Sequence, residues 1–331
     1  MPLRRGDRGD AVRDLQRRLA GLGCTATGDA PGTFGDATDQ AVRSFQERRR
    51  LRVDGICGRE TWGALVEAGY QLGDRLLYLR QPMLRGDDVA QLQRQVGSLG
   101  FDAGRVDGIF GPDTETALRE FQRNTGLPVD GVCGPSTLQA LARLTGRAAH
   151  QGDTVVAAVR ETESLRRGPR TLAGRLVVVG EPGGLHALTT AMTRALARLG
   201  AVATAVAHDD PSDQAAAANN AGAHVFVGIQ VTAARAGCTT AYYARPDYES
   251  DAGRRLAEQL QSALPRVVGV PDGGVHGLTL PVLRETRMPA VLCELGPAAV
   301  VVERTGAVAE AVADALRLWA AAPCAGLEDT A

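Results

Sequence analysis

Gln230 is the residue at which this sequence raises its sharpest chemical question. It ends the apolar run "HVFVGIQ", which predicts a buried strand. Functional groups of open α/β folds gather at the carboxyl ends of their strands, so this position suits a reactive side chain. An amide oxygen, however, is a poor ligand for zinc compared with a neutral imidazole. Glu181 and Glu294 stand at or near the ends of two other apolar runs, "RLVVVG" and "AVLCEL".

The elements that would position these residues alternate along residues 174–321. Besides the three runs above, "AVATAVA" and "TTAYYA" predict further strands. Helices are expected between the strands, at "LHALTTAMTRALARLG", "DQAAAANNAG", "DAGRRLAEQLQSAL" and "GAVAEAVADALRLWA". This alternation predicts an α/β domain with a mostly parallel sheet. Residues 322–331 would then form a short tail.

This second half resembles the zinc-dependent N-acetylmuramoyl-L-alanine amidase family over about residues 174–320. The family pattern "AN...AD.F.SIHAN" is similar to residues 218–230, and "PA.L.E.G" is similar to residues 289–296. The resemblance implies three protein ligands for zinc, a reactive water in the fourth position, and a glutamate that acts as general base. Glu294 falls on that glutamate, although Pro297 follows where the family has an aromatic residue.

The family's zinc-ligand positions hold other residues in this chain. Gln230 falls on the third ligand, a histidine. Aligning "VGEPGG" with the family's "DPGHGG" puts Pro182 on the first ligand, also a histidine. Counting back from the helix end at Gly200 instead puts Glu181 on the second ligand, a glutamate. Either alignment keeps at most one of three ligands, so the resemblance predicts that no metal is bound.

The histidines offer one way to rebuild a metal site. They are His150, His186, His208, His224 and His276. A set of Glu181, His186 and His276 remains open as an alternative. His150 falls in a polar, weakly periodic stretch, residues 146–173, that predicts a linker. His224 lies six residues before Gln230, about 20 Å away along an extended strand.

An internal repeat fills the first half of the chain. Residues 8–23 align with residues 85–100, and residues 34–65 align with residues 110–141. Each copy predicts three short helices with apolar residues on one stripe, and its Asp-Gly pairs predict tight turns. The chain is therefore expected to be multidomain, with two small all-α units ahead of the α/β domain.

The repeats resemble the peptidoglycan-binding-like domain, a three-helix module. Its pattern "G..V..LQ..L..LG…T..A...FQ…VDG..G..T...L" occurs twice, and we predict units at residues 3–70 and 82–145. The second unit has the family's first Asp-Gly turn as Asp107-Gly108, whereas the first unit has Pro31-Gly32. A glycan-binding groove is therefore expected more strongly in the second unit than in the first.

Composition and charge narrow the possible partners. The net charge is −1, which gives no electrostatic case for binding nucleic acid or an anionic membrane. No apolar run typical of a signal peptide follows the N-terminus, and no run is long enough to span a bilayer. The six cysteines lack CxxC spacing, so reduced thiols are expected, with Cys57 and Cys133 as small buried side chains. The sequence predicts a cytoplasmic protein.

Two binding modules ahead of an amidase domain with altered ligands resemble a class of actinobacterial amidase-like proteins. That resemblance implies a catalytically inactive pseudoenzyme that regulates peptidoglycan precursor synthesis. The implied partner is the enolpyruvyl transferase that acts on UDP-N-acetylglucosamine, and a muropeptide is a second candidate ligand. The alternative is an active zinc amidase with Glu294 as base and Glu181 as a ligand. A third hypothesis is an exported wall-binding protein. No cofactor is expected unless the zinc alternative holds.

Overall fold

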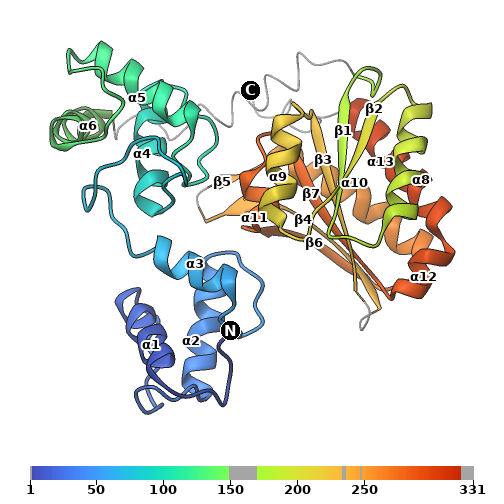
Figure 1. The fold of residues 1–331 in the computed structure, drawn as a ribbon, viewed down its shortest axis with the longest axis horizontal. Coiled ribbons are helices and arrows are strands. Elements are labelled where there is room, and N and C mark those ends of the chain that lie inside the picture. Colours follow the sequence, from blue (N-terminus) through green and yellow to red (C-terminus); the bar gives the residue numbers. More distant parts are fainter. Residues whose placement is uncertain (1, 149–169, 233–235, 247, 322–331) are drawn as a thin grey trace. The chain divides into compact units, whose positions relative to one another are not determined.

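The computed structural model describes residues 2–148, 170–232, 236–246 and 248–321. They divide into two compact units, one within residues 1–160 and the other within residues 161–331 (Figure 1). Within these ranges no helix is both long enough and apolar enough to cross a membrane. His150, most of the predicted linker and the predicted tail lie outside the described residues.

Each repeat of the first unit folds as three helices, as the apolar spacing predicts. They are α1 (Asp10–Gly21), α2 (Asp36–Arg48) and α3 (Arg59–Glu67) in the first repeat, then α4 (Asp87–Ser98), α5 (Pro112–Asn124) and α6 (Pro135–Ala148) in the second. Val12, Leu15 and Leu19 form the stripe of α1 and are fully buried. Gly23 follows α1 with a φ of 74°, the left-handed conformation that favours glycine after a helix. At 14 residues, α6 is longer than the short helix expected there.

Both repeats close their apolar cores with the same backbone pairing. Leu3 pairs with Cys57 in the first repeat, and Leu77 pairs with Cys133 in the second. Burial of Cys57 and Cys133 raises the pKa of each thiol to about 12. Both are free, as are the other cysteines in the described ranges. The expectation of small buried side chains at these two positions is confirmed.

The second unit is built on a sheet that has seven strands within the described residues. They are β1 (Leu176–Glu181), β2 (Val202–Ala207), β3 (Val225–Val231), β4 (Gly237–Arg245), β5 (Tyr248–Glu249), β6 (Asp272–Leu278) and β7 (Ala290–Gly296). The order is β2-β1-β3-β7-β4-β5, with β6 paired to β4. Strands β2, β1, β3 and β7 run parallel, while β4 is antiparallel to β7. The carboxyl ends of β1, β3 and β7 therefore share one edge, and the prediction of a mostly parallel sheet is confirmed.

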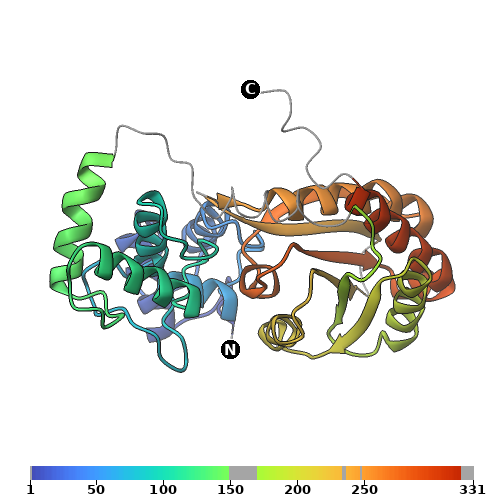
Figure 2. The same cartoon turned by 90° about the horizontal axis from the view of Figure 1, so that it is seen from above.

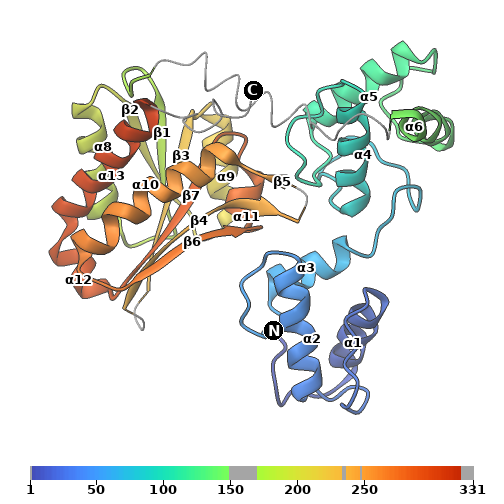
Figure 3. The same cartoon turned by 180° about the vertical axis from the view of Figure 1, so that it is seen from behind.

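Helices cover both faces of this sheet (Figures 1 and 2). Helices α8 (His186–Arg198), α10 (Asp251–Val268) and α13 (Thr305–Ala321) share one core with the strands, on the α10 face. Helices α9 (Pro211–Asn220) and α11 (Pro281–Glu285) share another, on the α9 face. Helix α10 crosses in front of the sheet in Figure 3. Because side chains alternate along a strand, each strand residue belongs to one of these two faces.

Four elements were not expected from the sequence: β5, β6, α11 and α12 (Ala298–Glu303). Strand β6 has the sequence "DGGVHGL", and glycine and aspartate are poor strand formers. Gly273 is nevertheless required there, because a Cβ at this position would lie 2.4 Å from Thr239 Cγ2 of β4. Tertiary contact with β4, rather than local preference, makes this segment a strand.

Candidate functional site

Gln230 and Glu294 lie side by side at the carboxyl edge of the sheet. They are partners in the parallel register of β3 and β7, which places their Cα atoms about 5 Å apart. Phe226 and Leu292, on the same strands, belong to the core of the α9 face. By alternation, Gln230 and Glu294 point to the α9 face as well, and both are half-buried.

Glu181 points to the opposite face of the sheet. It ends β1 after Val177 and Val179, which pack in the core of the α10 face. Its carboxylate accepts hydrogen bonds from the backbone N–H of Leu185 and from Thr189 Oγ1, the latter at 3.3 Å. Glu181 is only 2% exposed, so these hydrogen bonds at the start of α8 take the place of water around its carboxyl group. Glu181 caps a helix, and strand β3 separates it from Glu294.

The donor set at the family's ligand positions does not fit zinc. The side chain of Pro182 has no donor atom, and Gln230 offers a neutral amide. Glu181 has its carboxylate bound to α8 on the other face. Throughout the described part of the chain, no three His, Cys, Asp or Glu side chains are grouped so as to hold a metal ion. No catalytic step through zinc can be derived from these residues.

The described histidines do not assemble with Glu181. All four of them, His186, His208, His224 and His276, are exposed. His186 begins α8, whereas His276 lies on β6. In the order β1-β3-β7-β4-β6, Glu181 and His276 are four strand spacings apart, which is roughly 19 Å. The structure therefore does not bring Glu181, His186 and His276 together.

Asn219, which lies in the segment similar to the amidase pattern, joins α9 to the segment around α11 by hydrogen bonds. Its Nδ2 donates to the carbonyl of Glu285 at 2.8 Å, and its Oδ1 accepts from the N–H of Arg287 at 2.9 Å. Ser212 Oγ donates to the carboxylate of Glu285 at 3.1 Å. These bonds tie both ends of α9 to the segment around α11. The pattern thus contains residues that build the α9 face as well as residues that do chemistry in other family members.

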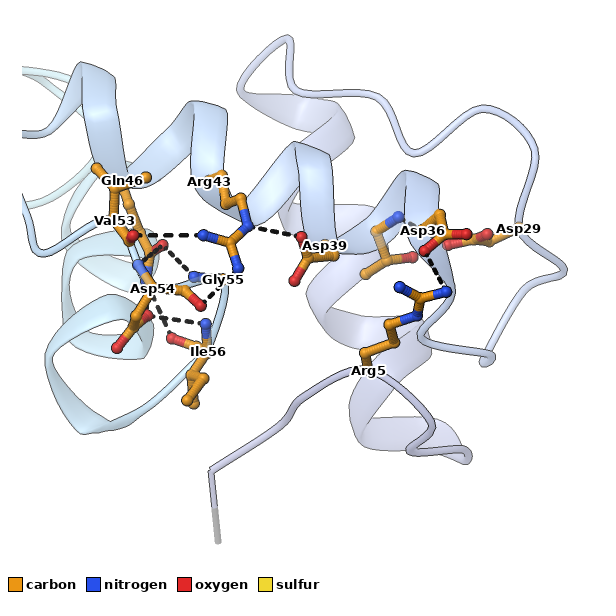
Figure 4. Close-up of polar contacts among 11 residues, drawn as sticks. Arg5, Asp29, Asp36, Asp39, Arg43, Gln46, Val53, Asp54, Gly55 and Ile56 are labelled. Atoms are coloured by element: carbon orange, nitrogen blue, oxygen red, sulfur yellow. Dashed lines mark hydrogen bonds and ion pairs between the residues drawn. The ribbon is translucent and has the colours of Figure 1, made fainter. Parts of the chain in front are cut away.

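The most regular polar groups of the first unit are glutamines that hold turns. Gln46 of α2 accepts a hydrogen bond from the N–H of Gly55 at 2.9 Å (Figure 4). Its Nε2 donates to Asp54 Oδ1 at 2.8 Å and to Thr61 Oγ1 at 3.1 Å. One side chain therefore joins a helix, an Asp-Gly turn and the start of the next helix.

This arrangement occurs four times in the first unit. The glutamines are Gln16, Gln46, Gln93 and Gln122, and each accepts from the N–H of a turn glycine and donates to a threonine hydroxyl. In three of the turns the Nε2 also donates to the aspartate, at 2.7–2.9 Å. The exception is the Pro31-Gly32 turn, which has no aspartate, and there Gln16 Nε2 donates instead to the carbonyls of Thr33 at 3.0 Å and Ala30 at 3.4 Å. Gln16 is half-buried, whereas the other three glutamines are almost fully buried.

In each repeat, an arginine donates a hydrogen bond to the carbonyl just before the second Asp-Gly turn. Arg43 donates from Nε to Asp39 at 2.7 Å and from Nη1 to the carbonyl of Val53 at 3.3 Å (Figure 4). At the equivalent place in the second repeat, Arg119 Nη1 donates to the carbonyl of Val129 at 3.0 Å. The turns are therefore held from both sides by side chains.

The role of these glutamines was not predicted from the sequence. Their signal was present, because "LQ" and "FQ" recur at the same place in both repeats. A glutamine next to an apolar stripe is usually a solvated residue, so its type alone does not show that it is buried. Its Asp-Gly and threonine partners lie eight or more residues away in the chain.

Two protein families match the chain. The peptidoglycan binding domain matches residues 8–65 and again residues 85–141. The N-acetylmuramoyl-L-alanine amidase family matches residues 185–316. The first two matches fall on the two repeats, and the third covers the second unit from the start of α8 into α13.

Curated relatives match either most of the chain or one of its parts. N-acetylmuramoyl-L-alanine amidase CwlM of Mycobacterium tuberculosis is 35% identical over 337 aligned residues, covering 89% of this chain and 81% of CwlM. N-acetylmuramoyl-L-alanine amidase CwlL of Bacillus licheniformis is 33% identical over 164 residues, covering 43% of this chain and 45% of CwlL. The spore cortex-lytic enzyme of Bacillus cereus is 50% identical over 85 residues, covering 25% of this chain and 33% of that enzyme.

Solved structures match the two units separately. The amidase Ami1 of Mycobacterium smegmatis is 17% identical with a TM-score of 0.39, and the match covers 45% of this chain and 98% of Ami1. The N-terminal domain of SleB is 40% identical with a TM-score of 0.21, covering 22% of this chain and 97% of that domain. From the family matches and the 35% identity to CwlM over most of both chains, this protein belongs to the N-acetylmuramoyl-L-alanine amidase family and carries two peptidoglycan-binding repeats.

Proposed function

We propose that this protein is a catalytically inactive member of its family that regulates peptidoglycan precursor synthesis in the cytoplasm. The observation that carries the proposal is the pair Gln230 and Glu294 on the α9 face. The position of the general base keeps its carboxylate, while the adjacent ligand position holds an amide. A carboxylate without a metal-activated water beside it is a weak catalyst of amide hydrolysis. Glu181 cannot replace a missing ligand, because it binds α8 on the other face.

The proposed partner is the enolpyruvyl transferase that acts on UDP-N-acetylglucosamine. The similarity to CwlM extends over 89% of this chain, so the repeats and the amidase-like unit are matched together. An amidase fold that no longer hydrolyses its substrate can still present the same edge of the sheet to a partner. A muropeptide or a peptidoglycan precursor is a second ligand class that this edge suits.

The test measures the rate of the transferase and the hydrolysis of muropeptides, both with the same preparation of the full chain. Titrating the protein into the transferase from the same organism is expected to change the rate of enolpyruvyl transfer until the proteins are equimolar. Muropeptides are expected to release no peptide, with or without added zinc. A transferase rate that does not change at any ratio contradicts the regulatory role. Zinc-dependent release of peptide contradicts inactivity and establishes the amidase alternative.

Two controls make these outcomes specific. A zinc amidase of the same family, assayed in parallel, shows that the muropeptides are cleavable and that the zinc is available. Glu294→Gln keeps the size of the side chain and removes its charge. Any hydrolysis that persists at the same rate in this variant comes from a contaminating enzyme, because Glu294 is at the position of the family's base.

A further inference from the structure

Strand β2 is the outermost strand on one side of the sheet, and among the described residues it pairs with β1 alone. The N–H of Val202, its first residue, donates to the carbonyl of Arg175 at 2.9 Å. Since backbone groups alternate along a strand, the even-numbered residues of β2 bond to β1. The N–H and C=O groups of Ala203, Ala205 and Ala207 therefore point away from β1, where another strand could pair with them.

This outer side of β2 has none of the features that usually prevent pairing between proteins. Its sequence "VATAVA" contains no charged residue, proline or glycine. Strand β6, outermost on the opposite side of the sheet, has the sequence "DGGVHGL" and an irregular register with β4. Val202 is 58% exposed, although valine is mostly a buried residue. The contrast favours a partner strand on β2 rather than on β6.

The sequence of β2 favours a second copy of the same strand as that partner. Residues 201–207 are "AVATAVA", which reads the same in both directions from Thr204 at its centre. Antiparallel pairing about Thr204 would place Val202 opposite the partner's Val206 and Ala203 opposite the partner's Ala205. The two alanines would exchange backbone hydrogen bonds, because both direct their N–H and C=O groups outward.

The side chains also match across this pairing. Val206 packs against the core of the α9 face, so Val202 and Thr204 point to that face by alternation. A two-fold axis perpendicular to the sheet keeps the α9 faces of both copies on one side, and the exposed Val202 would then pack on the partner's Val206. Residues 199–207 include no charged side chain, so the pairing brings no like charges together.

We propose that β2 pairs antiparallel with β2 of a second copy, so that two amidase-like units share one continuous sheet. The same groups of each copy then face each other across a two-fold axis. Pairing of this length buries less area than an obligate dimer interface, so we expect a dissociation constant on the order of micromolar. The proposal does not depend on whether the carboxyl edge of the sheet is catalytic.

The first measurement is sedimentation velocity of the full chain at concentrations from about 1 to about 300 µM. A shift from monomer to dimer is expected, and a chain that stays monomeric throughout overturns the proposal. Thr204→Lys would place two positive charges opposite each other and is expected to weaken the dimer by about tenfold or more. Val302→Lys, at an exposed position of α12, is the matched control and should leave the dimer unchanged. A dimer that is equally stable in both variants also overturns the proposal.

Disulfide cross-linking tests the register and does not depend on how Thr204→Lys folds. The two copies of Thr204 would form a non-hydrogen-bonded pair with Cα atoms about 4.5 Å apart, a distance that a disulfide can span. Thr204→Cys is therefore expected to give a cross-linked dimer under mild oxidation. Ala207→Cys is the matched control on the same strand, because its two copies would lie roughly 20 Å apart. Cross-linking of Thr204→Cys that does not exceed that of Ala207→Cys and of the unsubstituted chain overturns the proposal.

Discussion

The two units of this protein have kept different parts of their family patterns. In the repeats, the polar pattern residues are present and interlocked, as in the bonds of Gln122 to Asp130 and Thr137. In the amidase-like unit, the strands and helices are present, while the polar ligand positions at the carboxyl edge hold Pro182 and Gln230. The difference follows from what each polar residue does for the fold.

A buried polar residue that pairs backbone groups cannot be replaced without leaving those groups unpaired. A half-buried polar residue at the open edge of a sheet that pairs no backbone group can be replaced with little loss of stability. Gln122 is an example of the first kind, and Gln230 of the second. Replacing Gln122 should therefore lower the free energy of unfolding far more than replacing Gln230.

The largest expected effect is that of Gln122→Leu. It leaves the N–H of Gly131 and the hydroxyl of Thr137 without their partner, so we expect the free energy of unfolding to fall by roughly 2–4 kcal/mol. Thermal unfolding of the first unit, followed by circular dichroism, measures this loss. Gln139→Leu, at an exposed position of α6, is the matched control. Equal stability of the two variants would contradict the structural role of Gln122.

A smaller loss is expected for Glu181→Ala in the second unit. The substitution removes the acceptor for the N–H of Leu185, and loss of a helix cap lowers the free energy of unfolding by roughly 1–2 kcal/mol. Thr189→Val, which keeps the bond from Leu185 to Glu181 and removes the contacts of the Thr189 hydroxyl, should have a smaller effect. If Glu181→Ala leaves stability unchanged and instead removes bound zinc, then Glu181 is a ligand and its assignment as a cap is wrong.

The stability of the repeats should also fall in acid. Hydrogen bonds from the N–H of Val132 and from Gln122 lower the pKa of Asp130 below its ordinary value of 3.8. Because the folded pKa is lowered, this contribution is complete above about pH 4 and is lost as the pH falls through the folded pKa. Unfolding in denaturant at a series of pH values measures it. Asp130→Asn should flatten that part of the profile, and an unchanged profile contradicts the assignment.

The smallest expected effect is that of Gln230→His. The side chain is half-buried at the edge, so we expect a change in the free energy of unfolding below about 0.5 kcal/mol. We also expect no zinc to be retained, because Pro182 and Glu181 still supply no ligand on the α9 face. Zinc retained by this single variant would show that the remaining ligand positions are intact.

The sequence predicted the frame of the second unit but not the orientation of its polar residues. Strands such as β1 and β3 are continuous apolar runs, which identify buried strands without showing which residue faces which layer. For that reason Glu181 remained a candidate ligand until its bond to Leu185 was seen. Strand β6 was missed because its pairing with β4, rather than its composition, makes it a strand.

In the first unit the helices and turns were predictable, but the polar network was not. The spacing of Val12, Leu15 and Leu19 indicates a helix from local sequence alone. The network joins each glutamine to a turn and a threonine that lie eight or more residues away, and local spacing does not show that these groups meet.

The central claim, that the amidase-like unit does not hold the metal its family uses, has a direct test. The measurement is zinc per chain in the full, tag-free protein after dialysis against excess zinc and then against zinc-free buffer. The account predicts that no stoichiometric zinc is retained. One tightly held zinc per chain, lost in Glu181→Ala, would contradict it and would make hydrolysis of muropeptides the expected activity.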